Sequence, residues 1–170
     1  MTRNTAREIA AHLSYELSFT DKTVEELLHE RLTSEAFAEL AEEDSLYTEA
    51  PNAKQVAYIT RLVTGVNEHA AELDGYIAKY AKNWKFSRIP LVASAIMRVA
   101  MYEILYMQDI PNGAAINEAV EIAKKIRDAG NREIYQRNSG QLRAGRDLPV
   151  SISTNRQSGR GTDRLRSAFL

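Results

Sequence analysis

The sequence contains no cysteine among its 170 residues, which excludes disulfide bonds and thiolate metal sites. It also lacks the apolar N-terminal segment of a secretory signal, because its opening residues, MTRNTAREIA, are mostly polar or small. We therefore expect a protein of the reducing cytoplasm. The hydrophobic fraction of 44% is typical of a globular chain with one ordinary core.

A long apolar run free of charge is missing as well. The most apolar stretch, IPLVASAIMRVAMYEILYM at residues 89–107, is long enough to cross a membrane, but it contains Arg98 and Glu103. Charged side chains near the centre of a bilayer are costly. The stretch therefore predicts a central, buried helix, and we expect no membrane partner.

The sequence motifs of the common enzyme classes are absent. There is no Gly-rich phosphate loop, nucleophile elbow or Walker motif. Glu26 and His29 have the ExxH spacing used in di-iron bundles, but such a site needs a second ExxH motif, which the chain lacks. We expect no enzymatic activity, no metal site and no cofactor.

Helical periodicity extends through the first 126 residues, and no stretch alternates with the period of two expected of a strand. The chain is therefore predicted to be all-α, a compact array of antiparallel helices. A weaker helix is expected within residues 35–52. The stronger predicted helices span residues 2–19, 24–32, 53–70, 71–81, 88–107 and 114–125.

Lysine is absent after residue 125, and the charge balance changes sign there. Residues 1–126 hold nineteen acidic side chains against thirteen basic ones, whereas residues 127–170 hold nine arginines and four acids. A basic tail behind an acidic body usually indicates nucleic-acid binding.

The N-terminal segment carries a second possible RNA-binding feature. Arg3 and Arg7 lie one helical turn apart, and Tyr15 follows on the same predicted helix. Arginine can pair with phosphates, and tyrosine can stack on an unpaired base. The alternative is a solvated helix surface with one half-buried tyrosine, and the spacing alone favours this alternative.

Three stretches together resemble the NusB family of bacterial transcription antitermination factors. They are TAREIAAHLSYEL near the start, IPLVASAIMRVAMYEILYMQDIP in the middle, and AAINEAVEIAKK after it. The resemblance covers about residues 3–125, and it implies a helical protein of two three-helix units. Family members often have an acidic residue at the position of Ala93 and a basic one near Gly113.

The resemblance also implies a function. NusB proteins bind the boxA sequence of ribosomal RNA transcripts together with NusE, a ribosomal protein, and act on the RNA polymerase elongation complex. By position, the implied RNA-binding residues are Arg3, Arg7, Tyr15, Tyr80 and Arg98. Single-stranded RNA would be recognised through phosphate contacts and base stacking.

Two alternatives to this function were weighed. A helical protein–protein adaptor could have kept a NusE-like partner surface after losing RNA binding. The helical RNA-binding domain of an RNA methyltransferase is disfavoured, because no catalytic domain follows.

The resemblance stops after Lys125. Family members continue with a polar loop and a last helix of the form F-[IV]-N-G-[VI]-L, which this chain lacks. Codons can be chosen for residues 124–140 so that removing one A from a run of A bases gives KKYETPETGKFINGIL, which contains that motif. We therefore interpret residues from Ile126 onward as a frameshift product of a NusB gene. The rival interpretation is a genuine disordered Arg-rich arm that binds RNA.

The frameshift interpretation divides the chain into two parts. Residues 1–126 form the NusB-like helical RNA-binding domain, and residues 127–170 form an Arg-rich, disordered aberrant tail. The missing helix would bury about four large apolar side chains, worth roughly 6–12 kcal/mol, whereas a whole domain is stable by only about 5–15 kcal/mol. We expect a marginal C-terminal half that exposes Ile116, Val120 and Ala123.

Overall fold

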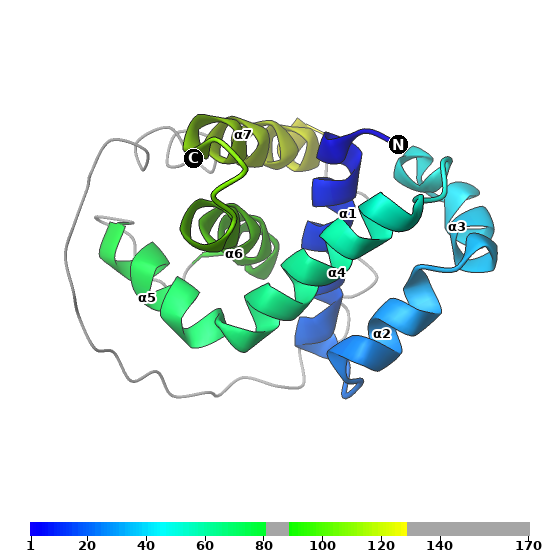
Figure 1. The fold of residues 1–170 in the computed structure, drawn as a ribbon, viewed down its shortest axis with the longest axis horizontal. Coiled ribbons are helices and arrows are strands. Elements are labelled where there is room, and N and C mark those ends of the chain that lie inside the picture. The colour runs from blue at the N-terminus through cyan, green and yellow to red at the C-terminus, as the bar shows by residue number, and fades with distance from the viewer. Residues whose placement is uncertain (81–88, 129–170) are drawn as a thin grey trace. The chain divides into compact units, whose positions relative to one another are not determined.

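The computed structural model describes residues 1–80 and 89–128, which form seven α-helices and no strand (Figure 1). The predicted all-α class is confirmed. The chain divides into two units, one ending at Glu68 and the other beginning at His69. No helix in the described ranges has both the length and the hydropathy that a membrane span requires.

The first unit contains four α-helices. They are α1 (Arg3–Glu16), α2 (Val24–Arg31), α3 (Ser34–Ala41) and α4 (Ala53–Glu68), with short 3-10 turns at Leu17–Phe19 and Ser45–Tyr47. The helix α1 packs mainly against α4, which crosses it in Figure 1. The short α3 is the helix that the sequence predicted only weakly, and it is a fourth helix beside the three that the family resemblance implied for a unit.

Side-chain caps explain where these helices begin. The hydroxyl oxygens of Thr2, Thr23 and Thr33 each accept a hydrogen bond from the backbone N–H three residues later. The Asn52 side chain accepts from the N–H groups of Lys54 and Gln55. These bonds satisfy donors that the first turn of a helix leaves unpaired. Thr23 also takes part in a capping box, because its backbone N–H donates to the Glu26 side chain.

The helix α1 is buried over ten consecutive residues, Ala6 to Tyr15. Its apolar residues at helical spacing, Ala6, Ile9, Ala10 and Leu13, are buried, while Leu17 in the following 3-10 turn is half-buried. Because polar Arg7, Glu8 and His12 are also buried, hydropathy alone did not predict how completely α1 is enclosed. The predicted central helix at residues 89–107 is buried less continuously, because half-buried residues occur between its buried ones.

The second unit contains α5 (Ala70–Tyr80), α6 (Leu91–Tyr106) and α7 (Asn112–Asp128) within its described residues. The helix α6 packs against both α5 and α7. Pro90 is the N-cap residue of α6, so the helix begins three residues later than the predicted start at residue 88. Residues 81–88 lie outside the described residues.

The helix α7 is longer than predicted at both ends. It begins at Asn112, inside the expected break, and continues three residues past Lys125. Its buried residues are Ala115, Ala119, Ile122, Ala123 and Ile126. Of the three residues expected to be exposed, Ile116 and Val120 are half-buried, whereas Ala123 is buried. The predicted tail beyond Asp128 lies outside the described residues.

Candidate functional site

Arg3 is exposed at the first residue of α1. Its guanidinium carbon lies 5.9 Å from the centre of the Tyr58 ring on α4, which is a cation–π distance. The contact holds the arginine against α4 while the charge remains accessible. Arg3 is therefore positioned to meet an anion such as a phosphate.

Arg7 lies one turn further along α1 but is only 2% exposed. Its Nη1 donates a hydrogen bond to Asn4 Oδ1 at 3.2 Å. A buried guanidinium needs such partners, since a charge removed from water is otherwise costly. In this arrangement Arg7 is part of the packed interior of the chain.

Tyr15 is 4% exposed, and its ring packs edge-on against Phe19 with the ring centres 4.8 Å apart. Burial raises the pKa of the Tyr15 hydroxyl. A base could stack on this ring only after a rearrangement of its surroundings.

Tyr80, the last residue of α5, belongs to a cluster with Tyr76 and Lys79. The Tyr76 and Tyr80 rings are nearly parallel, with centres 6.4 Å apart. Lys79 Nζ lies 5.1 Å from the centre of the Tyr80 ring and 6.0 Å from that of Tyr76. Both tyrosines are half-buried, so this cluster offers an aromatic surface and a positive charge together.

Arg98 on α6 is held by Asp74 on α5. Arg98 Nε donates to Asp74 Oδ1 at 2.6 Å, and Arg98 Nη2 donates to Oδ2 at 2.7 Å. This two-pronged geometry is the strongest arrangement available to an arginine and a carboxylate. The guanidinium of Arg98 therefore has a structural partner that a phosphate would have to displace or share.

The five predicted residues fall into both units of the chain. Arg3, Arg7 and Tyr15 belong to the first unit, and Tyr80 and Arg98 belong to the second. Among them, Arg3 and Tyr80 have accessible contact groups, and each has a neighbour that the sequence reasoning did not name. Tyr58 lies far from Arg3 in sequence, so no local signal predicted that contact. The i, i+4 spacing of Tyr76 and Tyr80, in contrast, is visible in the sequence.

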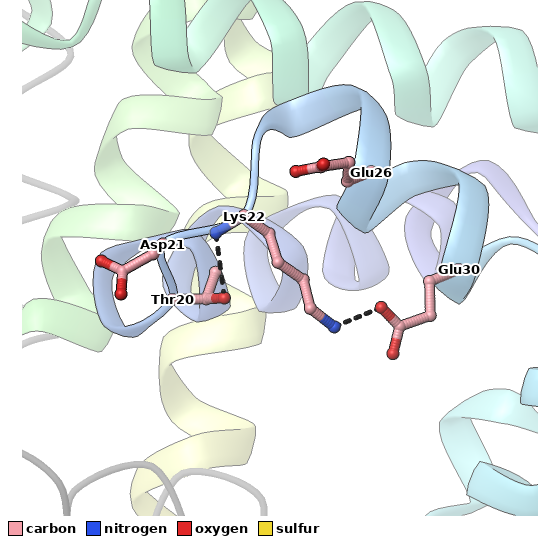
Figure 2. Close-up of a pocket in the computed structure, with 5 residues that line it drawn as sticks. All are labelled: Thr20, Asp21, Lys22, Glu26 and Glu30. Carbon is pink, nitrogen blue, oxygen red and sulfur yellow. Dashed lines mark hydrogen bonds and ion pairs between the residues drawn. The ribbon is translucent and has the colours of Figure 1, made fainter.

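A hollow at the start of α2 is a different kind of surface (Figure 2). Its lining is mainly acidic, with Asp21, Glu26 and Glu30, and Lys22 forms an ion pair with Glu30. The backbone N–H of Thr23 donates to Glu26 and lowers the pKa of its carboxyl. Glu26 therefore serves as a helix cap in the ExxH segment, and the acidic lining would repel RNA phosphates.

Comparison with known protein families and relatives identifies the family to which the chain belongs. The NusB family model matches residues 4–134 of the chain. The chain belongs to the NusB family. The match covers all seven helices except the first residue of α1, so the family resemblance noted in the sequence is confirmed.

Curated relatives give the same result over most of their length. The transcription antitermination protein NusB of Natranaerobius thermophilus is 37% identical over 126 residues, covering 74% of this chain and 83% of that protein. The Bacillus subtilis protein of the same name is 36% identical over 128 residues, covering 75% and 84%. The Acetivibrio thermocellus protein of that name is 40% identical over 124 residues, covering 73% and 76%. The chain thus stands among the NusB transcription antitermination proteins.

Proposed function

We propose that this protein is an RNA-binding transcription antitermination factor that recognises boxA RNA of ribosomal RNA transcripts together with NusE. The observation that carries the proposal is the NusB family match over residues 4–134. The RNA polymerase elongation complex would be reached indirectly, through this RNA–protein assembly. We also propose a cytoplasmic location and expect no catalytic activity.

We expect the five proposed residues to differ in how directly they contact RNA. Arg3 and Tyr80 would contact RNA directly, Arg3 through phosphate and Tyr80 through base stacking, because Arg3 is exposed and Tyr80 is only half-buried. Arg7, Tyr15 and Arg98 are buried or paired, so any contact by them would follow a local rearrangement on binding. Among these five residues, we therefore expect Arg3 and Tyr80 to contribute more to the affinity than the other three.

The burial of Arg7 and Tyr15 also favours the second candidate, a helical adaptor that binds a NusE-like protein but not RNA. The acidic hollow at α2 is in keeping with that alternative, since it disfavours RNA on that side of the first unit. The two candidates differ in one property, which is affinity for single-stranded RNA.

A binding titration separates the two functions. A fluorescent boxA-like RNA and a scrambled RNA of the same composition would be titrated with the protein, with and without NusE, at several salt concentrations. Antitermination predicts that boxA binds more tightly than the scrambled RNA and that NusE strengthens the difference. Binding of NusE with no detectable RNA binding would establish the adaptor function instead.

Single substitutions test whether Tyr80 contributes to RNA binding. Tyr80→Ala should weaken boxA affinity, since stacking on an aromatic side chain contributes about 1–3 kcal/mol per base, whereas Tyr80→Phe should retain it. Lys124→Ala, at an exposed pair with Glu121 on α7, is the control and should leave affinity unchanged. Equal affinities for Tyr80→Ala and Lys124→Ala would remove Tyr80 from the proposed interface.

A further inference from the structure

The helix α4 carries a row of basic and aromatic side chains beside its packed side. Lys54, Tyr58 and Arg61 are spaced i, i+4 and i+7, so they lie along one face of the helix. Lys54 and Arg61 are exposed, and Tyr58 is half-buried. The buried residues of α4 are Ile59, Leu62, Val63, Gly65 and Val66, so this row flanks the packed side of the helix.

Arg3 joins this row from α1. The cation–π contact between Arg3 and Tyr58 places a third positive charge beside the aromatic ring. We name Arg3, Lys54, Tyr58 and Arg61 the α1–α4 strip. From Lys54 to Arg61 the helix rises about 10 Å, which is long enough for contacts with neighbouring nucleotides of one strand.

Along the sequence of α4, acidic residues occur only before the helix and at its end. Glu49 precedes α4 and forms an ion pair with the amino group of Met1. Glu68 is the last residue of α4, seven residues after Arg61. The strip combines three basic side chains with one aromatic ring, in a chain whose residues 1–126 are acidic overall. Basic side chains gathered on one face are the electrostatic footprint of a nucleic-acid contact.

We propose that the α1–α4 strip is a binding surface for single-stranded RNA, in which Arg3, Lys54 and Arg61 contact successive phosphates and Tyr58 stacks on a base. The proposal rests on the proposed function, and it adds the three α4 residues to the interface. Phosphate contacts by flexible basic side chains and stacking on an aromatic ring are the two interactions that proteins combine on single strands.

Charge reversal on α4 tests the strip directly. Lys54→Glu and Arg61→Glu would each be compared with Lys22→Glu, which makes the same charge change at an exposed lysine of the same unit, beside the acidic hollow. Affinity for a boxA-like RNA would be measured by fluorescence anisotropy across a salt series. We expect each strip variant to bind roughly tenfold more weakly than Lys22→Glu and to lower the salt slope by about 0.7, as the loss of one phosphate contact on a single strand predicts.

Substitutions at Tyr58 test whether its aromatic ring stacks on a base. Tyr58→Phe should retain affinity, whereas Tyr58→Leu should lose roughly tenfold with the salt slope unchanged, because stacking carries no charge. Thermal melts of all variants show whether each is folded. As a readout that needs no variant, photo-crosslinking of a thiouridine-containing RNA to the wild-type protein should label a peptide within residues 53–68.

The results separate this proposal from the proposed function. If wild-type protein binds RNA but Lys54→Glu and Arg61→Glu match Lys22→Glu, the strip is overturned while the proposed function stands. A crosslink confined to other peptides would also overturn the strip. If wild-type protein binds no RNA with or without NusE, both proposals fail.

Discussion

Arg98 on α6 and Asp74 on α5 form a two-pronged ion pair, with N–O distances of 2.6 and 2.7 Å. Both side chains are mostly shielded from solvent, at 18% and 17% exposure. The pair ties together the two helices that share an apolar cluster of Ile77, Ile89 and Ala93. The family resemblance predicted Arg98 as an RNA contact, so its two possible roles need a test that separates them.

Arg98→Ala should lower the free energy of unfolding by about 1–3 kcal/mol, because it removes hydrogen bonds to a shielded carboxylate. The exposed Lys124–Glu121 pair is the matched control, and Lys124→Ala should cost less than about 0.5 kcal/mol. Denaturant unfolding measures both changes. Equal costs for the two variants would contradict a structural role for the Arg98 pair.

Exchanging the two charges, with Asp74→Arg and Arg98→Asp together, separates stability from RNA binding. We expect the double variant to recover part of the stability while RNA affinity stays reduced, because an aspartate at position 98 cannot bind phosphate. Recovery of RNA affinity together with stability would show that Arg98 acts only through the ion pair.

The hydroxyl of Tyr106 is predicted to lose its proton at a higher pH than that of an ordinary tyrosine. Its hydroxyl donates to Glu72 Oε2 at 2.5 Å, and this bond raises the pKa of Tyr106 to about 12 from the ordinary value of 10.0. Because the folded-state pKa is the higher one, the stability from this bond is fully present below about pH 10 and is lost as the pH rises toward 12. Tyrosinate absorbance, compared between wild type and Tyr106→Phe, should locate the late transition, and Glu72→Gln should move it to lower pH. An unchanged transition in Glu72→Gln would contradict this assignment.

Tyr47 is predicted to stabilise the first unit through its hydroxyl. The Tyr47 oxygen lies 3.1 Å from His12 Nδ1, and both side chains are buried. Burial also raises the pKa of the Tyr47 hydroxyl. Tyr47→Phe should cost about 1–3 kcal/mol, because it leaves a buried imidazole nitrogen without this partner. Tyr106→Phe, at a more exposed bond, is the control and should cost less in a thermal melt at neutral pH. The reverse order would rule out a special contribution from the buried pair.

Position 113 is predicted to tolerate replacement of its glycine by a basic residue. It is the second residue of α7, it is exposed, and an added Cβ would meet no atom within 4 Å. Family members often carry a basic residue near this position. Gly113→Lys should therefore fold normally and raise boxA affinity, with the salt slope increased by about 0.7 for one added phosphate contact on a single strand. Gly113→Ala separates charge from helix propensity and should change stability only. Equal RNA affinities for the two variants would contradict a phosphate contact at this position.

The frameshift hypothesis makes a prediction about the gene and about stability. The gene should contain a run of A across the codons for Lys124 to Ile126, and the alternative frame should encode the FINGIL motif. A repaired chain should be more stable by roughly 6–12 kcal/mol, since the added helix would bury large apolar side chains and could cover the half-buried Ile116 and Val120. Absence of the A run, or a stop codon before the motif, would refute the hypothesis. One sharp cooperative melt of the present chain at an ordinary temperature would also count against it.

The helix bounds show where sequence patterns are sufficient. The predicted helix at residues 2–19 corresponds to α1 with its following 3-10 turn, and the predicted helix at residues 24–32 corresponds to α2. The start of α7 was wrong, because Pro111, Asn112 and Gly113 looked like a break. Proline lacks an N–H that the first turn does not need, and the Pro111 carbonyl accepts from Ala114 and Ala115. The helix therefore starts directly after the proline.

Sequence alone determined the all-helical class and the family, because both are carried by local patterns: apolar spacing, capping residues and the order of three short motifs. It could not distinguish Arg3 from Arg7, which are the same residue type one turn apart on the same helix. Only the tertiary structure decided that Arg3 is exposed beside Tyr58 while Arg7 is enclosed. The physical reason is that the burial of a polar side chain depends on partners from elements distant in sequence, and hydrophobic periodicity contains no information about them.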